Sequence, residues 1–359
     1  MAAFPKSTDV FVVGGGPAGL AAAIAARLKG FDVIVADAAQ PPIDKACGEG
    51  LMPDSFEAIG RLGIRLDTEQ SFPFRGIRFH GAGISVAATF PREHGVGIRR
   101  TRLHELLIDR AHELGVSMLW GTRVSGLSEE TVLFDDAAIR CRWVIGADGQ
   151  NSRVRRWAGL DAVRAESTRY GFRRHYRLAP WTDHMEIYWG SGCQMYMTPV
   201  SPREVCAVVI SRDSHLRLDS ALQQFPELSS RLGGASSSTS ERGSITASRR
   251  LRQVYRGRTI LIGDASGSVD AITGEGLSLS FHQALALADA MVSGDLAAYQ
   301  REHRCLARRP AFMGSLMLTL DRFPWLRSPM LHAMAFEPAI FAKLLAVHVG
   351  APSPAPAVS

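Results

Sequence analysis

Three glycines near the start of the chain have the spacing of a turn that binds phosphate. Gly14, Gly16 and Gly19 form the pattern G-x-G-x-x-G. In such a turn the first glycine permits a tight bend, the second lets the backbone approach a pyrophosphate, and the third lets a helix pack closely on a strand. Asp37 follows Gly19 by 18 residues, near the spacing of a carboxylate that binds a ribose hydroxyl. These four residues indicate that the chain binds a dinucleotide.

The residues around this turn predict the strands and the helix that must position it. The apolar run Val10–Val13 is typical of a buried parallel strand. Residues 17–29 are rich in alanine and are followed by Gly30, which is typical of a helix with a glycine stop. A second strand is expected over residues 31–37. A glycine-rich turn without a ligand is the alternative, and the order of strand, turn, helix, strand and acid argues against it.

Composition and charge exclude several other classes of protein. Of the 359 residues, 46% are hydrophobic and 21% are charged, as in an ordinary globular protein. The net charge is +6, but no basic block has interleaved aromatic residues, so we expect no nucleic-acid partner. The five cysteines lie far apart without a C-x-x-C pair, which predicts neither disulfides nor a metal site. Without a signal-peptide pattern or a run of about 18 apolar residues, we expect a cytoplasmic protein.

Two later segments indicate which dinucleotide is bound. Residues 141–160 contain Gly146-Ala147-Asp148-Gly149, followed by a serine and an arginine in the pattern G-A-D-G-x-x-S-x-x-R. Residues 257–291 contain an apolar strand that ends in Gly-Asp and then a glycine loop that opens a long helix. With these segments the chain resembles the FAD-dependent aromatic hydroxylase and geranylgeranyl reductase families, which share one flavoprotein fold. The resemblance covers about residues 8–310 and implies that the cofactor is FAD.

The resemblance also implies roles for individual residues. The segment with Asp148 would hold the pyrophosphate region, Asp264 would bind the ribityl chain, and Arg100 and the backbone at Val124 would contact the cofactor. The glycine loop would place a helix N-terminus beside the flavin ring, where its partial positive charge favours the negative charge of reduced flavin. The cofactor-binding residues expected in this way are Gly14, Gly16, Pro17, Ala18, Gly19, Asp37, Lys45, Cys47, Gly48, Arg100, Val124, Asp148, Gly149, Asp264, Gly274, Glu275, Gly276 and Leu277.

The expected fold class is α/β, with a Rossmann-like FAD-binding domain interleaved with a second domain. Several segments between residues 165 and 212 are rich in β-branched and aromatic residues and predict an antiparallel sheet, which in the resembled fold roofs the substrate pocket. The domains expected are an FAD-binding domain (residues 1–73, 97–164 and 248–310), a substrate-binding domain (74–96 and 165–247), a C-terminal helical cap (311–350) and a disordered tail (351–359).

Cys47 lies in the stretch Lys45-Ala46-Cys47-Gly48-Glu49-Gly50, which resembles a reductase segment at the meeting point of flavin and substrate cavity. Cys47 is therefore one catalytic candidate, and Lys45 beside it would favour the thiolate. A packed small residue is an equally favoured interpretation, because free cysteine is most often buried. A redox pair with another cysteine has no support from spacing. His282, on the helix beside the flavin, is the second catalytic candidate.

The reaction itself stays open at this level. The hydroxylases usually carry a Gly-Asp-Ala-His segment and then a proline before the glycine loop, whereas this chain has Gly267 for the histidine and Ala271-Ile272 for the proline. The pattern resembles geranylgeranyl reductases and in part flavin halogenases, although the halogenase motif W-x-W-x-I-P is absent. Reduced flavin would either deliver hydride to a polarised double bond or activate oxygen for monooxygenation. We expect NAD(P)H as the electron donor, without a second dinucleotide-binding motif.

The substrate is expected to be a hydrophobic small molecule: a prenyl compound, a polyketide or an aromatic. The resemblance suggests this, and so does the apolar tail over residues 311–350, with helices expected to be split at Pro324, Pro329 and Pro338. A helical cap over the core is the favoured interpretation of this tail, and a substrate lid or a surface that touches a membrane is the alternative. A flavin-binding sensor or carrier without turnover is the alternative to an enzyme. The sequence does not indicate an oligomeric state.

Overall fold

A mainly parallel sheet forms the first half of the structure. The computed structural model describes residues 5–91 and 93–350. Five strands of this sheet run parallel, β17 pairs antiparallel at one edge, and the hairpin of β9 (Gly126–Ser128) and β10 (Thr131–Leu133) extends β11. In order across the sheet, the strands are β17 (Tyr255–Arg256), β18 (Thr259–Leu261), β11 (Ala138–Gly146), β1 (Ser7–Val13), β2 (Val33–Asp37) and β8 (Ser117–Trp120).

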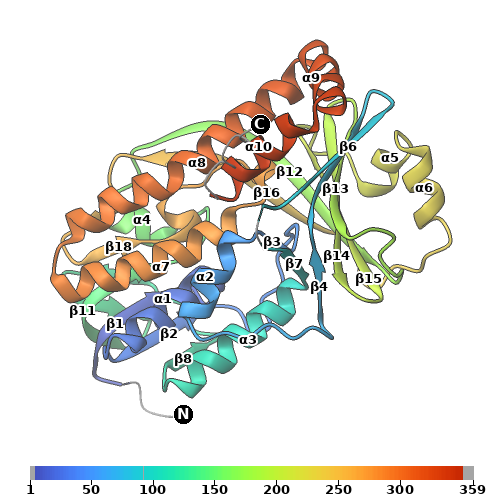
Figure 1. The fold of residues 1–359 in the computed structure, drawn as a ribbon. Coiled ribbons are helices and arrows are strands. Elements are labelled where there is room, and N and C mark those ends of the chain that lie inside the picture. The colour runs from blue at the N-terminus through green and yellow to red at the C-terminus, as the bar shows by residue number, and fades with distance from the viewer. Residues whose placement is uncertain (1–4, 92, 351–359) are drawn as a thin grey trace.

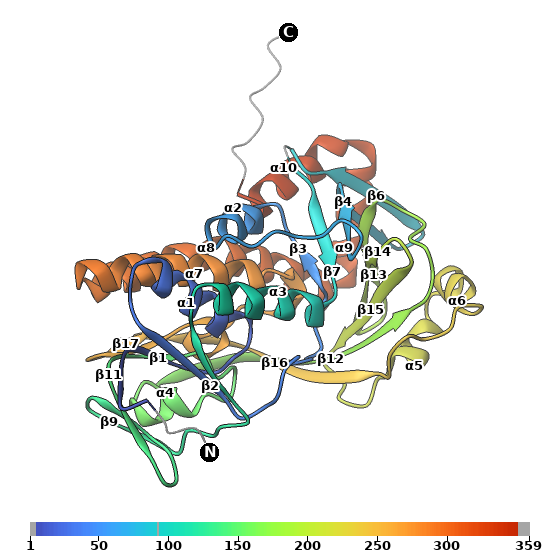
Figure 2. The ribbon, with the colours of Figure 1, turned by 90° about the horizontal axis from the view of Figure 1, so that it is seen from below.

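Both faces of this sheet are covered, which is why the central strands β1 and β2 contain continuous apolar runs. Val10 and Val12 of β1 pack in the core beneath the long helices, whereas Phe11 and Val13 pack in a second core on the other face. Figure 2 shows α1, α3 and α7 above the sheet and α4 with the β9 hairpin below it. The helices of this half are α1 (Pro17–Leu28), α2 (Asp54–Arg61), α3 (Arg100–Glu113), α4 (Arg153–Trp157) and α7 (Gly276–Ser293).

A seven-stranded sheet forms the second half. Its neighbours pair antiparallel except β13 and β5, which are parallel. Helices α5 (Leu218–Leu222) and α6 (Pro226–Leu232) cover one face. The strands in order are β16 (Arg242–Leu251), β12 (Val163–Tyr176), β15 (Glu204–Ser211), β14 (Cys193–Ser201), β13 (His184–Trp189), β5 (Gly76–Gly81) and β6 (Ile84–Thr89).

Short elements join the two halves. A small sheet of β3 (Gly50–Leu51), β7 (Gly95–Ile98) and β4 (Ser71–Phe74) lies between them, and the 3-10 turns η1 (Gly263–Ser266) and η2 (Ala271–Thr273) lead from β18 into α7. The chain alternates between the two main sheets, and this arrangement confirms the expected α/β fold with an interleaved antiparallel sheet. The exact domain boundaries stay a prediction.

Three C-terminal helices complete the described chain. Helix α8 (Leu296–Arg322) runs beside α7, and α9 (Pro324–Phe336) and α10 (Pro338–His348) pack on β6 (Figure 1). Pro324 and Pro338 begin helices, as expected, because proline is tolerated in the first turn. The expected break at Pro329 was wrong, since this residue lies inside α9. The expected disordered tail lies outside the described residues.

Candidate functional site

One cavity of about 1020 Å³ connects the two halves of the molecule. At one end Asp37 and Val124 border it, beyond the carboxyl end of β2, which is where open α/β sheets bind their ligands. The glycine turn follows, then the loop from Lys45 to Gly50, and then the face of the antiparallel sheet. The cavity therefore extends from the parallel sheet to the antiparallel sheet and can hold an extended cofactor with a second molecule beside it.

The glycine turn has the geometry that its sequence predicts. Gly14 has φ +111°, and a Cβ there would lie 2.4 Å from the carbonyl oxygen of Ala147. A Cβ on Gly19 would lie 1.8 Å from the carbonyl oxygen of Gly14, so only glycine lets α1 approach β1 this closely. Gly16 instead faces open space, with no atom within 4 Å of a Cβ position, and α1 begins directly after it. This bare backbone at a helix N-terminus fits a pyrophosphate.

Asp37 braces the same turn. One carboxylate oxygen accepts the N–H of Gly15 at 2.7 Å, and the other accepts the N–H of Ala39 at 2.8 Å. The side chain also borders the cavity, at the end where the sequence places the ribose. Asp37 therefore has a structural function besides the predicted contact with the cofactor.

His104 is a residue of this site that the sequence did not reveal. It is fully buried, and its Nε2–H donates to the carbonyl oxygen of Gly15 at 2.7 Å. Its Nδ1 accepts the N–H of Ile43 at 3.3 Å. Burial lowers the pKa of His104, which agrees with the neutral ring that these two bonds require. A single histidine in a helix gives no signal in the sequence, although this one joins the glycine turn to the segment before Cys47.

The acids of the second and third motifs lie at the middle of the cavity. Asp148 borders it, but its carboxylate holds the start of α4 by accepting from the Ser152 hydroxyl at 2.5 Å and the Arg153 N–H at 2.6 Å. Asp264 also borders the cavity, and one of its oxygens lies 3.4 Å from Lys45 Nζ. Asp264 and Lys45 are both partly exposed to the cavity, where ribityl hydroxyls could replace their contact.

The N-terminus of α7 opens onto the cavity, as the resemblance implies. Gly274 has φ +70°, and Gly276 and Leu277 border the cavity beside it. Glu275 does not: its carboxylate is buried on the other side, 3.8 Å from the Arg309 guanidinium and 3.6 Å from the His348 ring. Burial raises the pKa of Glu275 to about 8, against the opposing effect of Arg309. Glu275 therefore faces away from the cavity at the start of α7.

Most of the remaining residues that the sequence predicts for the site border the cavity, but His282 and Gly19 do not. His282 lies outside the cavity, in two surface hollows along α7, and its Nδ1 donates to the carbonyl oxygen of Ser278 at 3.0 Å. This position does not support a catalytic function for His282. Gly19 packs inside the fold. The other predicted residues that border the cavity are Pro17, Ala18, Cys47, Gly48, Arg100 and Gly149.

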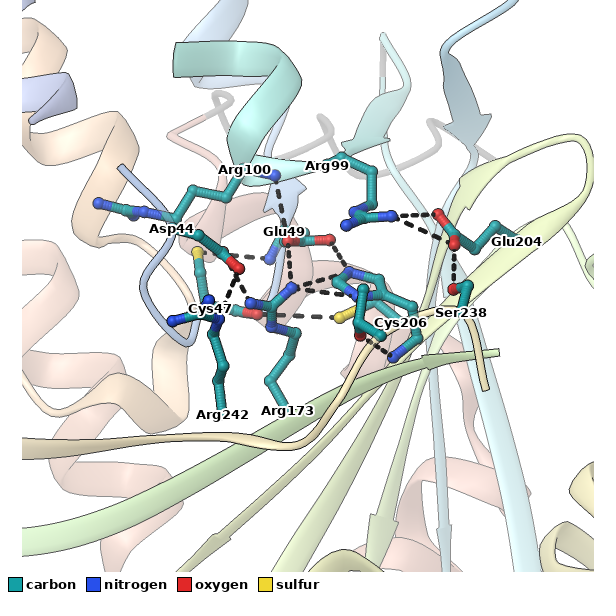
Figure 3. Close-up of polar contacts among 12 residues, drawn as sticks. Asp44, Cys47, Glu49, Arg99, Arg100, Arg173, Glu204, Cys206, Ser238 and Arg242 are labelled. Carbon is teal, nitrogen blue, oxygen red and sulfur yellow. Dashed lines mark hydrogen bonds and ion pairs between the residues drawn. The ribbon is translucent and has the colours of Figure 1, made fainter. Parts of the chain in front are cut away.

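Cys47 lies where the cofactor end of the cavity meets the sheet. Its Sγ accepts the N–H of Glu49 at 3.4 Å, and its carbonyl oxygen lies 3.8 Å from Cys206 Sγ (Figure 3). Cys206 is completely buried, and burial raises the pKa of its thiol well above the ordinary range. Cys47 thus lies on a loop that borders the cavity on one side and contacts buried Cys206 on the other.

A buried charge cluster behind this loop fixes it. Glu49 is buried with φ +59°, an uncommon conformation for a residue other than glycine. Its Oε2 lies 2.6 Å from His175 Nε2, and its Oε1 accepts the N–H of Arg100 at 3.1 Å. Arg173 lies 3.5 Å from the same carboxylate and donates to Asp44 at 2.7 Å. Figure 3 shows the side chains of Asp44, Glu49 and Arg173 meeting between the loop and the antiparallel sheet, with the backbone of Arg100 contacting Glu49 from α3.

The charges in this cluster compensate one another. Burial lowers the pKa of Arg173, but the negative charges of Glu49 and Asp44 outweigh this effect and raise it. Glu49, His175 and Cys206 have ligand atoms close enough for a metal ion. However, Arg173 Nη1 already lies 3.0 Å from His175 Nδ1, so a guanidinium provides the positive charge there. The absence of metal ligands stays a prediction.

The far wall of the cavity is mostly apolar. Met185, Val208 and Ile210 line it, together with Tyr196, whose hydroxyl donates to the carbonyl oxygen of Ile272 at 2.8 Å. A second, apolar cavity of about 50 Å³ lies under α8, α9 and α10, and Met185 borders both cavities. The site can therefore enclose a hydrophobic molecule beside the loop of Cys47.

The dinucleotide turn, the N-terminus of α7 and the apolar wall border one cavity, and this arrangement suits a flavoprotein oxidoreductase. The chain belongs to the FAD-binding domain family, which matches residues 7–294. The chain is thus an FAD-dependent oxidoreductase, and the resemblance to the hydroxylase and geranylgeranyl reductase superfamily is confirmed.

The chain is similar to individual proteins of this class over different shares of its length. The chain is 30% identical over 359 residues to the menaquinone reductase of Mycolicibacterium smegmatis, across 89% of this chain and 87% of that protein. It is 29% identical over 171 residues to the rifampicin monooxygenase of Rhodococcus hoagii, across 45% of this chain and 36% of that protein. Among solved structures, the flavin-dependent brominase Bmp2 has a TM-score of 0.80 at 20% identity, across 96% of this chain and 94% of that one. This last likeness shows the fold alone.

Proposed function

We propose that this chain is an FAD-dependent reductase that acts on a lipophilic substrate with a prenyl chain, such as a prenylated quinone, and takes electrons from NAD(P)H. The observation that carries the proposal is the single cavity in which the loop of Cys47 faces an apolar wall of the antiparallel sheet. A reductase of this kind needs a site that excludes water, in which a hydrophobic substrate contacts the redox cofactor.

The relatives support reduction over oxygenation. The menaquinone reductase is similar along nearly the whole chain, whereas the rifampicin monooxygenase is similar over less than half of it. The backbone agrees, because Gly267, in the segment where hydroxylases usually carry a histidine, has φ +113°. A Cβ there would lie 2.8 Å from the carbonyl oxygen of Arg249. Position 267 therefore has no room for a side chain in this backbone conformation.

Some residues of the chain would bind the cofactor, and others would position the substrate. FAD, when bound, supplies the redox chemistry. The turn at Gly16 and the side chain of Asp264 would hold the pyrophosphate and the ribityl chain. The start of α7 at Gly276 would stabilise negative charge at the ring. Met185 and Ile210 would exclude water from the substrate, and Cys47 would lie beside it.

Product analysis tests this proposal. The purified holoenzyme is incubated with menaquinone and either NADPH or NADH, once without oxygen and once in air. We expect a product in which one double bond of the prenyl chain has gained two hydrogen atoms in both cases, with no oxygen uptake stimulated by the substrate. A product heavier by one oxygen atom, formed only in air, would contradict reduction. A Gly16→Val variant without FAD is the control for non-enzymatic reduction.

A further inference from the structure

Large apolar side chains are exposed mainly on the three C-terminal helices. Phe336 is 92% exposed, Trp325 69% and Phe312 58%, and Ile340 and Val347 of α10 are also exposed. In the described part of the chain, the other large exposed apolar residues are spread over separate elements: Leu28, Leu133, Ile245 and Val292. A concentrated apolar surface of this kind marks an interaction site, whereas single exposed apolar residues are normal.

The helices that carry this surface are anchored by their opposite faces. Leu331 and Met334 of α9 and Phe341 and Leu345 of α10 are buried in the core formed with the antiparallel sheet. Within the described residues, no single helix is long and apolar enough to cross a membrane, but α9 and α10 together have that length and composition, with a bend of 107°. Two short helices anchored in this way are suited to lie along an interface.

The charges around the apolar surface are mainly positive. Arg308, Arg322 and Lys343 are exposed on α8 and α10. Among the described residues from 306 onward, Glu337 is the one exposed acid, and its carboxylate caps α10 by accepting the N–H of Ala339. Asp321 is buried against Arg169 at 2.6 Å. Anionic headgroups would therefore meet cations and very little opposing charge.

We propose that the outer face of α8, α9 and α10 binds the surface of an anionic phospholipid bilayer, with Trp325 and Phe336 inserted at the level of the headgroups. Tryptophan is favoured at this depth because its ring is apolar and its N–H is polar. The apolar cavity of about 50 Å³ lies directly under these helices and shares Met185 with the main cavity. The bilayer is thus placed beside the apolar end of the site. This inference goes beyond the proposed reductase activity and does not depend on it.

Vesicle flotation tests the proposal with the full-length holoenzyme. Vesicles of phosphatidylcholine with phosphatidylglycerol should carry the protein, and vesicles of phosphatidylcholine alone should carry less. The double variant Trp325→Ser, Phe336→Ser should lose roughly tenfold or more in vesicle affinity, because two large apolar side chains no longer leave water. Arg322→Glu with Lys343→Glu should weaken binding to the anionic vesicles alone. Val292→Ser, which removes a 60% exposed apolar side chain from α7, should bind like the wild type.

Two results would overturn the proposal. One is a wild-type holoenzyme that does not float with anionic vesicles at low ionic strength. The other is a dimer in analytical ultracentrifugation that the Trp325 and Phe336 substitutions dissociate while vesicle binding stays unchanged, since the face would then join two copies of the chain. Flotation needs no substrate, so a failure of the reductase assay leaves this test intact. Bound FAD and the thermal transition of each variant verify that it is folded.

Discussion

Glu49 Oε2 lies 2.6 Å from His175 Nε2, and this buried contact joins the loop of Cys47 to strand β12 of the antiparallel sheet (Figure 3). The same carboxylate accepts the N–H of Arg100 at the start of α3. One acid therefore links the cofactor-binding half, the loop and the substrate wall. The backbone N–H of the same residue donates to Cys47 Sγ, so Cys47 lies directly beside the cluster.

Replacing Glu49 should destabilise the protein strongly. Glu49→Gln removes a buried negative charge and leaves Arg173 and His175 with less compensation. We expect the free energy of unfolding to fall by about 3 kcal/mol, measured by urea denaturation. Glu227→Gln removes an exposed partner of Arg231 and should cost less than about 1 kcal/mol. Similar effects of the two substitutions would contradict the importance of the buried cluster.

Substitutions of two glycines in the phosphate turn should have different effects, one on stability and the other on FAD binding. Gly19→Ala should destabilise the apoprotein, because its Cβ would clash with the carbonyl oxygen of Gly14. Gly16→Val should leave the thermal transition of the apoprotein nearly unchanged but abolish FAD binding, because its side chain points into open cavity. Absorbance near 450 nm reports the flavin. Gly60→Ala, on a helix surface with no atom within 4 Å, is the control. A yellow Gly16→Val protein would contradict the site.

Cys47 should matter for turnover and not for FAD binding. Its thiol borders the cavity on the loop between the cofactor end and the apolar wall. For Cys47→Ala we expect full flavin content, a KM within about twofold and a kcat lowered at least about tenfold, as for the loss of a group that exchanges a proton. Cys305→Ala, at an exposed position, is the matched control. Unchanged kinetics of the Cys47 variant would favour the packing interpretation.

Glu275 should make stability depend on pH. Its folded-state pKa is about 8 and its ordinary value is 4.5. Between these values the native state keeps a proton that the unfolded state releases, so the free energy of unfolding falls as pH rises. The slope is about 1.4 kcal/mol per pH unit at most. Relative to Glu275→Gln, the wild type should therefore lose stability from pH 5 to pH 8. Urea denaturation across this range measures the difference, and a constant difference would contradict the buried neutral acid. Glu57→Gln, on the exposed surface of α2, should show no such trend.

The sequence predicts those parts of the site that depend on local backbone geometry. The spacing of Gly14, Gly16 and Gly19 predicts their functions, because the turn, the close approach to phosphate and the packing of the helix all involve residues that are neighbours in the sequence. The contact of Glu49 with His175 joins residues 126 positions apart, and no local pattern indicates it. The orientation of Glu275 was missed for the same reason, because Arg309 and His348 reach it only in the folded chain.

Anaerobic reoxidation of the reduced flavin tests the central claim most directly. The holoenzyme is reduced photochemically without oxygen and mixed with menaquinone, and absorbance near 450 nm is followed. If the cavity brings a prenylated substrate to the flavin, the absorbance should recover with one equivalent of substrate, and Glu49→Gln should slow the recovery. A flavin that stays reduced until oxygen is admitted would contradict a reductase and indicate an enzyme that needs oxygen as its second substrate.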